Sequence, residues 1–541
     1  MLIADENLPM PDAPRPRRFS GAVAVGAGIM LSRLAGLVRT RVLAHYLGEG
    51  TATDAFTAAL RIPNFLQNLF GEGVLSASFI PVYARLRAEN RHDDAVRVAR
   101  AVGTLLALVA TVLTALGVWL APVLVELLVP GFHGEARALT VALVRIVFPG
   151  VALLVMSAWC LGVLNSHRKF FLSYVSPVLW NAALIATAIV AGRRFAGALD
   201  DIVVWLAWGA VIGSAAQLLV QVPTVLGILR TMRPSLAVRD PGVQSTLHAF
   251  VPIVLGRGSV QLSGYIDQVL ASFLSKGIVT AISWASILYL LPVSLFGMSV
   301  SAAELPEMSS ATGDADVRAA HLQARLGGAL RRVVFLVVPS AVAFVAIGGP
   351  IIALLFQTGK FTAEDTRVMW IILAGSAIGL SASTQGRLLG SAFYALGDPK
   401  PPLHAALVRV AITGAAGYLF ALPVREALGY APEWGAFGLT ASAGFAAWIE
   451  FLLLRRWLDQ RIGRVPIPTK LGLGALAAAV LAGAAGYGAA RGLRVLTAHT
   501  ALVSVAAIVA FGVAYLGIMT LARVPEAADL VGKVARRVRR R

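Results

Sequence analysis

Apolar runs of roughly 20 residues, the length that a helix needs to cross a bilayer, recur along nearly the whole chain. We count about fourteen of them, centred near residues 33, 70, 113, 152, 182, 214, 260, 290, 341, 378, 412, 445, 480 and 510. A buried helix of a large soluble core would explain one such run, but not their recurrence. The pattern therefore predicts an all-α polytopic membrane protein with about 14 transmembrane helices, to within one or two because the first two spans are polar.

Composition agrees with this class: 57% of residues are apolar, 14% are charged and the mean hydropathy is +0.76. Soluble domains carry about a quarter charged residues. A net charge of +19 would indicate nucleic-acid binding in a soluble protein, but here most basic residues fall in loops on one side of the predicted membrane. Those loops hold Arg85, Arg87, Arg91, Arg97, Arg100, Arg168, Lys169, Arg230, Arg233, Arg239, Arg318, Arg325, Arg331, Arg332, Lys400, Arg455, Arg456, Arg461, Arg464 and Lys470. The positive-inside rule then places both termini in the cytoplasm, which requires an even number of spans.

The two ends of the chain and its single cysteine add little chemistry. Residues 1–19 are Pro-rich and polar, which predicts a disordered cytoplasmic tail without a cleavable signal peptide. Residues 526–541 form a basic cytoplasmic tail that is suited to contact anionic membrane lipids. Cys160 lies in an apolar span as a packing residue, and no thiolate metal site or cofactor motif is recognisable.

Two halves of the chain resemble one another. Leu34-Ala35-Gly36 recurs as Leu262-Ser263-Gly264, and Leu69-Phe70-Gly71 recurs as Leu295-Phe296-Gly297, in the same order and about 227 residues apart. Six spans separate the copies, so both enter the membrane in the same direction and form parallel repeats. We expect an N-lobe at 20–235, a C-lobe at 236–465 and two extra helices at 466–525. The substrate site should lie between the lobes, which would rock to give alternating access.

Catalytic motifs are missing, which favours a transporter over an enzyme. No HExxH motif or nucleophile elbow occurs, and the histidines are scattered mostly in loops. The segment Gly359-Lys360-Phe361-Thr362 is not a phosphate-binding loop, because Phe361 stands where Ser or Thr is required. Energy would then come from ion or voltage gradients or from consumption of the substrate.

Charged residues inside the first two spans are the main candidates for function. Arg33, Arg39 and Arg61, together with Asp54 and Glu72, make these spans too polar to face lipid. An arginine near the bilayer centre costs several kcal/mol and is kept where it lines a cavity or has a partner. The pattern indicates a path through the membrane for an anion.

Several strings of residues recur in one family of membrane proteins. They are Ser32 to Arg39, Thr53-Asp54-Ala55-Phe56, Arg61-Ile62-Pro63-Asn64, Phe70-Gly71-Glu72-Gly73, Ser76 to Val82, Leu355 to Thr362 and Phe393 to Asp398. With these strings the chain resembles, over about residues 20–525, the MurJ (MviN) lipid II flippases, a family within the multidrug/oligosaccharidyl-lipid/polysaccharide (MOP) exporter superfamily. The resemblance implies a monomeric multi-pass protein of the bacterial inner membrane. It would move undecaprenyl-diphosphate-linked disaccharide-pentapeptide, lipid II, from the cytoplasmic to the periplasmic leaflet for peptidoglycan synthesis, and docking to the cell-wall synthesis machinery is left open.

The resemblance also implies roles for residues of the first two spans. Arg33 and Arg39 match the family's first-helix arginines, assigned to diphosphate binding or to shaping the cavity, and Arg61 matches a basic position of the second helix. Asp54 matches an acidic residue at the outer end of that helix. On a straight helix Arg33 and Arg39 point about 120° apart. They reach one cavity only if it is wide or the helix bends near Gly36, and pairing of Arg39 or Arg61 with an acidic residue as structural glue is the alternative.

Further polar residues of the predicted spans have candidate roles in binding, gating or ion pairing. Glu72, between two glycines, is a gating partner for an arginine or a residue near a kink. Arg257 is expected to bind substrate and Asp267 to be a gating or charge partner, whereas Glu304 and Arg387 line the cavity or pair between lobes.

The chain departs from the family pattern at two positions. Gln67 and Ile287 stand where many members carry arginine, so the cationic cavity is thinner and its cargo less certain. Export of another polyprenyl-linked glycan, ion-coupled antiport of a small molecule and an inactive scaffold are therefore kept as alternatives. An exporter of cationic drugs would need an acidic cavity.

The predicted last two spans contain a run of Gly and Ala from Gly472 to Ala490. In the family the corresponding helices form a groove for the prenyl tail. Close packing of small residues against a neighbouring helix is the alternative.

Overall fold

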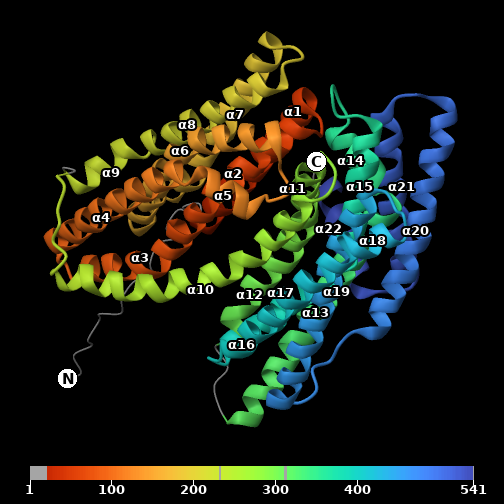
Figure 1. Cartoon of the computed structure of the whole chain (residues 1–541). Coiled ribbons are helices and arrows are strands. Elements are labelled where there is room, and N and C mark those ends of the chain that lie inside the picture. The colour runs from red at the N-terminus through yellow and green to blue at the C-terminus, as the bar shows by residue number, and fades with distance from the viewer. Residues whose placement is uncertain (1–20, 231–232, 310–313, 540–541) are drawn as a thin grey trace, which may run out of the picture.

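A computed structural model describes residues 21–230, 233–309 and 314–539. Every regular element within these ranges is a helix, which confirms the all-α fold class (Figure 1). The predicted tail at 1–19 lies outside the described residues, whereas most of the basic tail at 526–541 belongs to a final helix, α22 (Pro525–Arg539).

Within the described part of the chain, ten helices are long and apolar enough to cross a membrane, or eleven if one bent pair forms a single span. The bent pair is α15 (Ala363–Ala377) with α16 (Leu380–Ala395), which meet at 43°. The protein is thus a multi-pass membrane protein. Helices also lie at the other three predicted centres, near residues 33, 70 and 260, so fourteen spans stay a prediction.

Nine helices make up what we call the first helix group. They are α1 (Gly21–Leu47), α2 (Thr51–Phe70), α3 (Glu72–Ala88), α4 (His92–Trp119), α5 (Ala121–Leu128), α6 (Gly134–Ser166), α7 (Phe170–Arg194), α8 (Leu199–Leu219) and α9 (Val222–Leu229). Helix α6 contacts α2, α3, α4 and α8, and α1 packs along α7. Gly192 of α7 allows this close approach, because a Cβ there would lie 2.1 Å from the ring of Tyr46.

The long helix α10 (Pro241–Ser272) links this group to the second helix group. That group comprises α11 (Ile278–Pro292), the π-helix η1 (Val293–Met298), α12 (Ser299–Ser309), α13 (Ala315–Ala346), α14 (Gly348–Phe356), α15, α16, α17 (Lys400–Ala421), α18 (Pro423–Ala427) and α19 (Pro432–Ile462). Helix α19 contacts α15, α16 and α17, while α10 packs on α3 at one end and on α17 at the other.

The last helices pack on the outside of the second group. Helix α20 (Thr469–Leu496) lies against α13, and α21 (Thr500–Leu521) lies against α14. Gly483 permits the contact of α20 with α13, since a Cβ there would approach the Ala346 side chain to 2.8 Å. Part of the predicted Gly/Ala run is therefore used in close helix packing.

Both copies of the sequence repeat contain a break in the second helix. Gly71 separates α2 from α3, and a Cβ at Gly71 would lie 2.2 Å from the carbonyl oxygen of Gln67. The equivalent Gly297 lies in η1, where the helix widens to the π form, and its Cβ would meet the Thr384 side chain at 2.5 Å. The glycine-flanked weakening expected near Glu72 is thus present in the backbone, and π segments of this kind are frequent at functional sites.

The two groups converge at one end and diverge at the other. In Figure 1 they meet near the labels α1, α11 and α14, while α3 and α4 extend to one side and α12, α13 and α16 to another. The main hydrophobic cluster joins both groups and includes Leu47, Phe56, Trp284 and Phe361. Of the other described clusters, one belongs to the first group and α10 and another to the second group alone. Packing therefore holds the groups together at the converging end.

Candidate functional site

A cavity of about 230 Å³ lies where α1 and α2 meet α11. Its lining is a mixture of basic, hydroxyl and apolar side chains from both helix groups. They are Arg39, Thr40, Leu43, Leu47, Thr53, Phe56, Thr57, Leu60, Arg61, Asn64, Ser283, Trp284 and Ile287. Two of the predicted arginines, Arg39 and Arg61, thus share one cavity between the groups, and no carboxylate is among these described lining residues.

Arg39 is held by neutral groups of α7. Its Nη1 donates to Asn181 Oδ1 at 3.1 Å, and its guanidinium carbon lies 5.0 Å from the centre of the Trp180 ring. Its Nε is buried and has no hydrogen-bond partner among the residues that the structure describes. A ring face and one amide oxygen stabilise the cation, but they leave donor capacity of the guanidinium unused.

Arg61 connects α2 to α10 through the backbone. Its Nη2 donates to the carbonyl oxygen of Gly264 at 2.8 Å, and the Tyr265 hydroxyl donates to the carbonyl oxygen of Arg61 at 3.1 Å. A Cβ at Gly264 would lie 3.3 Å from Nη2, so a side chain there would crowd the guanidinium. One carbonyl oxygen does not neutralise a guanidinium, so these two hydrogen bonds leave the positive charge of Arg61 in place.

Asp267, the predicted charge partner on α10, lies near enough to feel the charges of Arg61 and Arg409. It forms no ion pair with a described residue, and its Oδ1 is buried with no hydrogen-bond partner in that same part of the chain. The carboxylate of Asp267 therefore interacts with the charge of Arg61, but it does not occupy the hydrogen-bond donors of the guanidinium.

Arg33 is directed elsewhere. It is exposed, and its Nη1 donates to Ser294 Oγ of η1 at 2.8 Å. Helix α1 runs without a break through Gly36, so Arg33 and Arg39 keep the angular separation of a straight helix. The structure therefore brings Arg39 and Arg61 together and places Arg33 outside the lining of their cavity.

Asp54 binds the opposite helix group through backbone groups. It is buried and accepts hydrogen bonds from the Gly277 N–H at 2.6 Å, the Thr280 N–H at 2.8 Å and Thr280 Oγ1 at 2.6 Å. These donors lie at the start of α11, where unpaired N–H groups and the helix dipole favour a negative charge. Asp54 therefore links α2 to α11 and pairs with neither Arg39 nor Arg61 among the described contacts.

Glu49, in the turn between α1 and α2, lies next to this contact. A Cβ at Gly277, which has a φ of 91°, would lie 3.1 Å from the Cβ of Glu49. Burial, followed by the negative charges of Asp365 and Asp54, raises the pKa of the Glu49 carboxyl well above its usual range. Glu49 thus adds a group at the converging end that prefers to be protonated.

The loop between α14 and α15 completes the same contact region. The Lys360 N–H donates to the carbonyl oxygen of His45 at 2.9 Å, and His45 Nδ1 lies 2.9 Å from Thr358 Oγ1. Arg41 Nη1 donates to the carbonyl oxygens of Leu354 and Leu355 at 2.6 and 2.7 Å. Polar bonds thus join the two helix groups at the end where α1 finishes, and we call the contacts of Asp54 and His45 the latch.

The remaining predicted residues are placed less fully. Glu72 and Arg257 belong to α3 and α10, but their side chains lie outside the described residues. Glu304 is buried in an ion pair with Arg332, and Arg387 is exposed. Ile287 lines the cavity, so its apolar side chain replaces a possible third cation, whereas Gln67 is not among the lining residues.

The sequence analysis missed the partners of the two cavity arginines. Trp180 and Asn181 are a Trp-Asn pair near the middle of a mostly apolar helix, one turn after Pro177, and that polar interruption was the available signal. Gly264 was noticed as part of the repeat, but not as the point of contact for Arg61.

Comparisons with known proteins agree on one family. The sequence matches the family model described as "Lipid II flippase MurJ" over residues 43–516. A relative of that name from Burkholderia cenocepacia is 34% identical over 449 residues, covering 82% of this chain and 84% of the relative.

Two solved structures have a similar fold. One is described as "Lipid II flippase MurJ, inward closed conformation", with a TM-score of 0.76, 23% identity and coverage of 94% of this chain and 100% of that one. The other is an inward-facing multidrug resistance MATE family transporter of the MOP superfamily, with a TM-score of 0.64, 17% identity and coverage of 82% and 98%.

Proposed function

Because the chain belongs to the lipid II flippase MurJ family, we propose that it moves lipid II from the cytoplasmic to the periplasmic leaflet of the bacterial inner membrane. The observation that carries this proposal is the pair Arg39 and Arg61, which line one cavity between the helix groups without a carboxylate among its described lining residues. Such a cavity attracts an anion and repels a cation.

The chemistry of the cargo suits these two residues. A diphosphate carries two negative charges, and moving it through hydrocarbon unaided would incur a large desolvation penalty. Guanidinium groups donate paired, permanently charged hydrogen bonds that replace the lost water. The unused Nε of Arg39 supplies a donor for that purpose.

The latch supports transport by alternating access. Asp54 and His45 hold the groups together at the end where α1 finishes, while the groups diverge at the opposite end (Figure 1). In our proposal the diverging end faces the cytoplasm, as the basic loops on that side require. Breaking the latch while the diverging ends close would expose the cavity to the periplasm.

We further propose that α20 and α21 receive the prenyl tail. Gly474, Gly488 and Gly492 of α20 have no described atom within 4 Å of a Cβ position, so this part of its surface is shallow and open. A cavity of about 930 Å³ also lies between α14, α15, α20 and α21. The shallow glycine surface suits an apolar chain, in contrast to the packed surface around Gly483, whereas the lining of the cavity includes the charged side chains of Arg367, Arg491 and Arg494.

The cavity charge distinguishes this function from its alternatives. An antiporter of cationic drugs would need carboxylates facing its substrate, and the described lining offers two arginines instead. An inactive scaffold could share the fold and the family, so growth of a flippase-depleted bacterium that expresses this chain separates a scaffold from a transporter.

Translocation can be measured directly in vesicles that contain the purified chain and fluorescent lipid II. The fraction of label accessible to an external quencher reports movement between leaflets. We expect Arg39→Ala and Arg61→Ala each to lower the rate by about tenfold to a hundredfold, the value of one charge-assisted hydrogen bond. Arg85→Ala, on the exposed surface of α3, is the matched control and should behave as wild type. Wild-type rates in both cavity variants would refute the proposed site.

A further inference from the structure

A second basic pocket lies at the diverging end of the first helix group, away from the cavity of Arg39 and Arg61. It has a volume of about 600 Å³ and is formed by the end of α3, the start of α4, His167 after α6, the end of α9, Arg230 and residues 233–235. The two sites share no lining residue. The pocket is therefore a separate site from the proposed translocation cavity.

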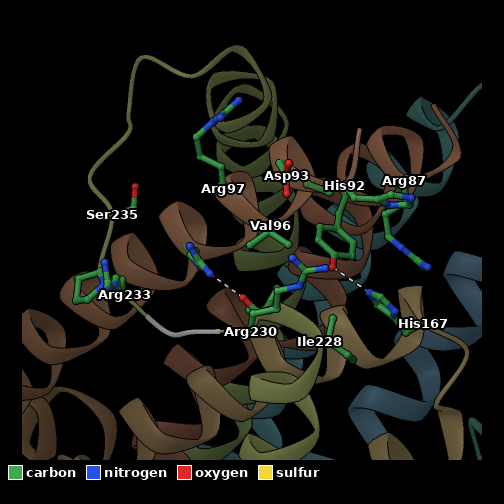
Figure 2. Close-up of a pocket in the computed structure, with 15 residues that line it drawn as sticks. Arg87, His92, Asp93, Val96, Arg97, His167, Ile228, Arg230, Arg233 and Ser235 are labelled. Carbon is green, nitrogen blue, oxygen red and sulfur yellow. Dashed lines mark hydrogen bonds between the residues drawn. The ribbon is translucent and has the colours of Figure 1, made fainter. Parts of the chain in front are cut away.

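The pocket lining is strongly cationic. Its charged and titratable residues are Arg87, Arg97, Arg100, Arg230, Arg233, His92, His167 and Asp93, together with Tyr83. Five arginines therefore face one carboxylate among the described lining residues. Figure 2 shows Arg230 between Arg233 and Ser235 on one side and Arg87, His92 and His167 on the other.

The arginines of the pocket differ in how far other groups of the protein neutralise their charge. Arg97 is neutralised by Asp94 and Asp240, and Arg100 donates to the carbonyl oxygen of Leu229 at 2.7 Å. Arg87 donates to the carbonyl oxygen of Ser166, which carries no charge. Arg87, Arg230 and Arg233 form no ion pair with any carboxylate in the described ranges. These three guanidinium groups leave positive charge available at the pocket.

His167 also lies among the positive charges of this pocket. Its Nε2 lies 3.0 Å from the Tyr83 hydroxyl, which orients the ring at the pocket wall (Figure 2). Burial, followed by the positive charges of Arg87, Lys169 and His92, lowers the pKa of His167 to about 4. Burial and the neighbouring positive charges both favour the neutral ring, and those charges agree with the excess of arginine in the pocket lining.

Helix α4 continues from this pocket into an exposed apolar surface. Leu108, which is 58% exposed, follows Arg97 by eleven residues, close to three helical turns, so the two share a face of α4. Val112 extends the same face. A basic pocket at the polar end of an apolar helix face fits a molecule with a phosphate group and an acyl chain, although the pocket alone would also accept a soluble phosphate.

We propose that this pocket binds a phosphate-bearing anion, with Arg87 and Arg230 as its principal ligands. Several guanidinium groups that line one pocket match the multiple acceptor oxygens of a phosphate better than the two of a carboxylate. A volume of about 600 Å³ also leaves room for the group esterified to the phosphate. Two sources share this chemistry, an anionic phospholipid of the adjacent leaflet and a soluble phosphate compound.

The test compares two double variants of the full chain with equal loss of charge. Arg87→Gln with Arg230→Gln removes the proposed ligands, and Arg85→Gln with Arg239→Gln removes exposed arginines of the same region that do not line the pocket. One arm counts phosphatidylglycerol molecules retained by the protein, using native mass spectrometry. The other titrates inorganic pyrophosphate into protein held in phosphatidylcholine nanodiscs, using calorimetry.

We expect the pocket pair to lose about tenfold or more in affinity in at least one arm, while the control pair matches wild type. Loss in the lipid arm alone identifies a phospholipid, loss in the pyrophosphate arm alone identifies a soluble anion, and loss in both shows that the two compete for the pocket. Equal losses in both pairs, or no loss in either, would overturn the proposal.

A second measurement needs no variant and so does not depend on folding of the glutamine pair. The titration of His167 can be followed by NMR in the wild-type chain, with and without each probe. A bound phosphate should raise the pKa of His167 by placing negative charge near the ring. If neither saturating pyrophosphate nor phosphatidylglycerol moves that titration, the pocket does not hold the anion.

Discussion

Asp54 and Arg39 both place a charge between the two helix groups, yet the protein treats them in opposite ways. Asp54 accepts three hydrogen bonds from the start of α11, all shorter than 3 Å. Arg39 has one amide oxygen and a ring face, and its buried Nε has no partner in the described structure. A charge that the protein satisfies completely holds the fold in one arrangement, whereas a charge left incomplete is available to a ligand.

Removal of the latch should give the largest effect on conformation. In Asp54→Ala the donors of Gly277 and Thr280 lose their acceptor, which costs about 2–4 kcal/mol of the converged state. The ratio of converged to separated molecules should fall on the order of a hundredfold. Spin labels at the exposed positions Ala196 and Ala363 would report the distance between the groups at this end. An unchanged distance distribution in Asp54→Ala would show that Asp54 does not hold the groups together.

A third cation in the cavity should destabilise the ligand-free protein and strengthen its binding of lipid II. Ile287→Arg places a guanidinium beside Arg39 and Arg61, so repulsion and desolvation should lower the melting temperature of the ligand-free protein. Added lipid II should then stabilise the variant more than wild type, with an affinity gain of about tenfold. Ile287→Leu is the matched control. Equal stabilisation of Ile287→Arg and wild type by lipid II would place the diphosphate elsewhere.

The backbone at Gly277 gives a smaller test of the latch. Its φ of 91° is unfavourable for any side chain, and a Cβ would crowd Glu49. Gly277→Ala should therefore weaken the Asp54 contact by about 1–2 kcal/mol. The same labelled pair should show a partial shift toward separation. Gly429→Ala, also at positive φ but with no described atom near its Cβ, controls for backbone strain alone.

Protonation of Glu49 should give the smallest effect. Its pKa is raised by burial and then by Asp365 and Asp54, so the protonated form favours the converged state. This stabilisation is complete below the ordinary glutamate value of about 4.3 and is lost as pH rises through the raised pKa. The converged fraction should thus fall with increasing pH in wild type and stay level in Glu49→Gln. An equal fall of the converged fraction in Glu49→Gln would show that Glu49 is not the group responsible.

Local patterns were enough to predict the helices and one of their irregularities. Apolar runs predicted the positions of the ten or eleven described helical segments that are long and apolar enough to cross a membrane, because burial in lipid requires a long apolar stretch in sequence. Gly71 and Gly297 were recognised as repeat partners, and both mark a break or π-turn in the structure. These features depend on residues that are neighbours along the chain.

The contacts of the charged residues could not be predicted in the same way. Asp54 binds groups 223 to 226 residues further on, and Arg39 binds Asn181, 142 residues away. Which carbonyl or ring meets a guanidinium depends on how helices from distant parts of the sequence cross. Helical geometry did predict that Arg33 and Arg39 point apart, but not that Arg61 would be the one to join Arg39.

Binding of lipid II to the purified chain tests most directly whether the incomplete charges are the ligand site. We predict that Arg39→Gln combined with Arg61→Gln weakens binding about a hundredfold or more. Arg85→Gln combined with Arg239→Gln, which removes two exposed arginines that do not line this cavity, should stay within about threefold of wild type. Wild-type affinity in the double arginine variant would contradict the account.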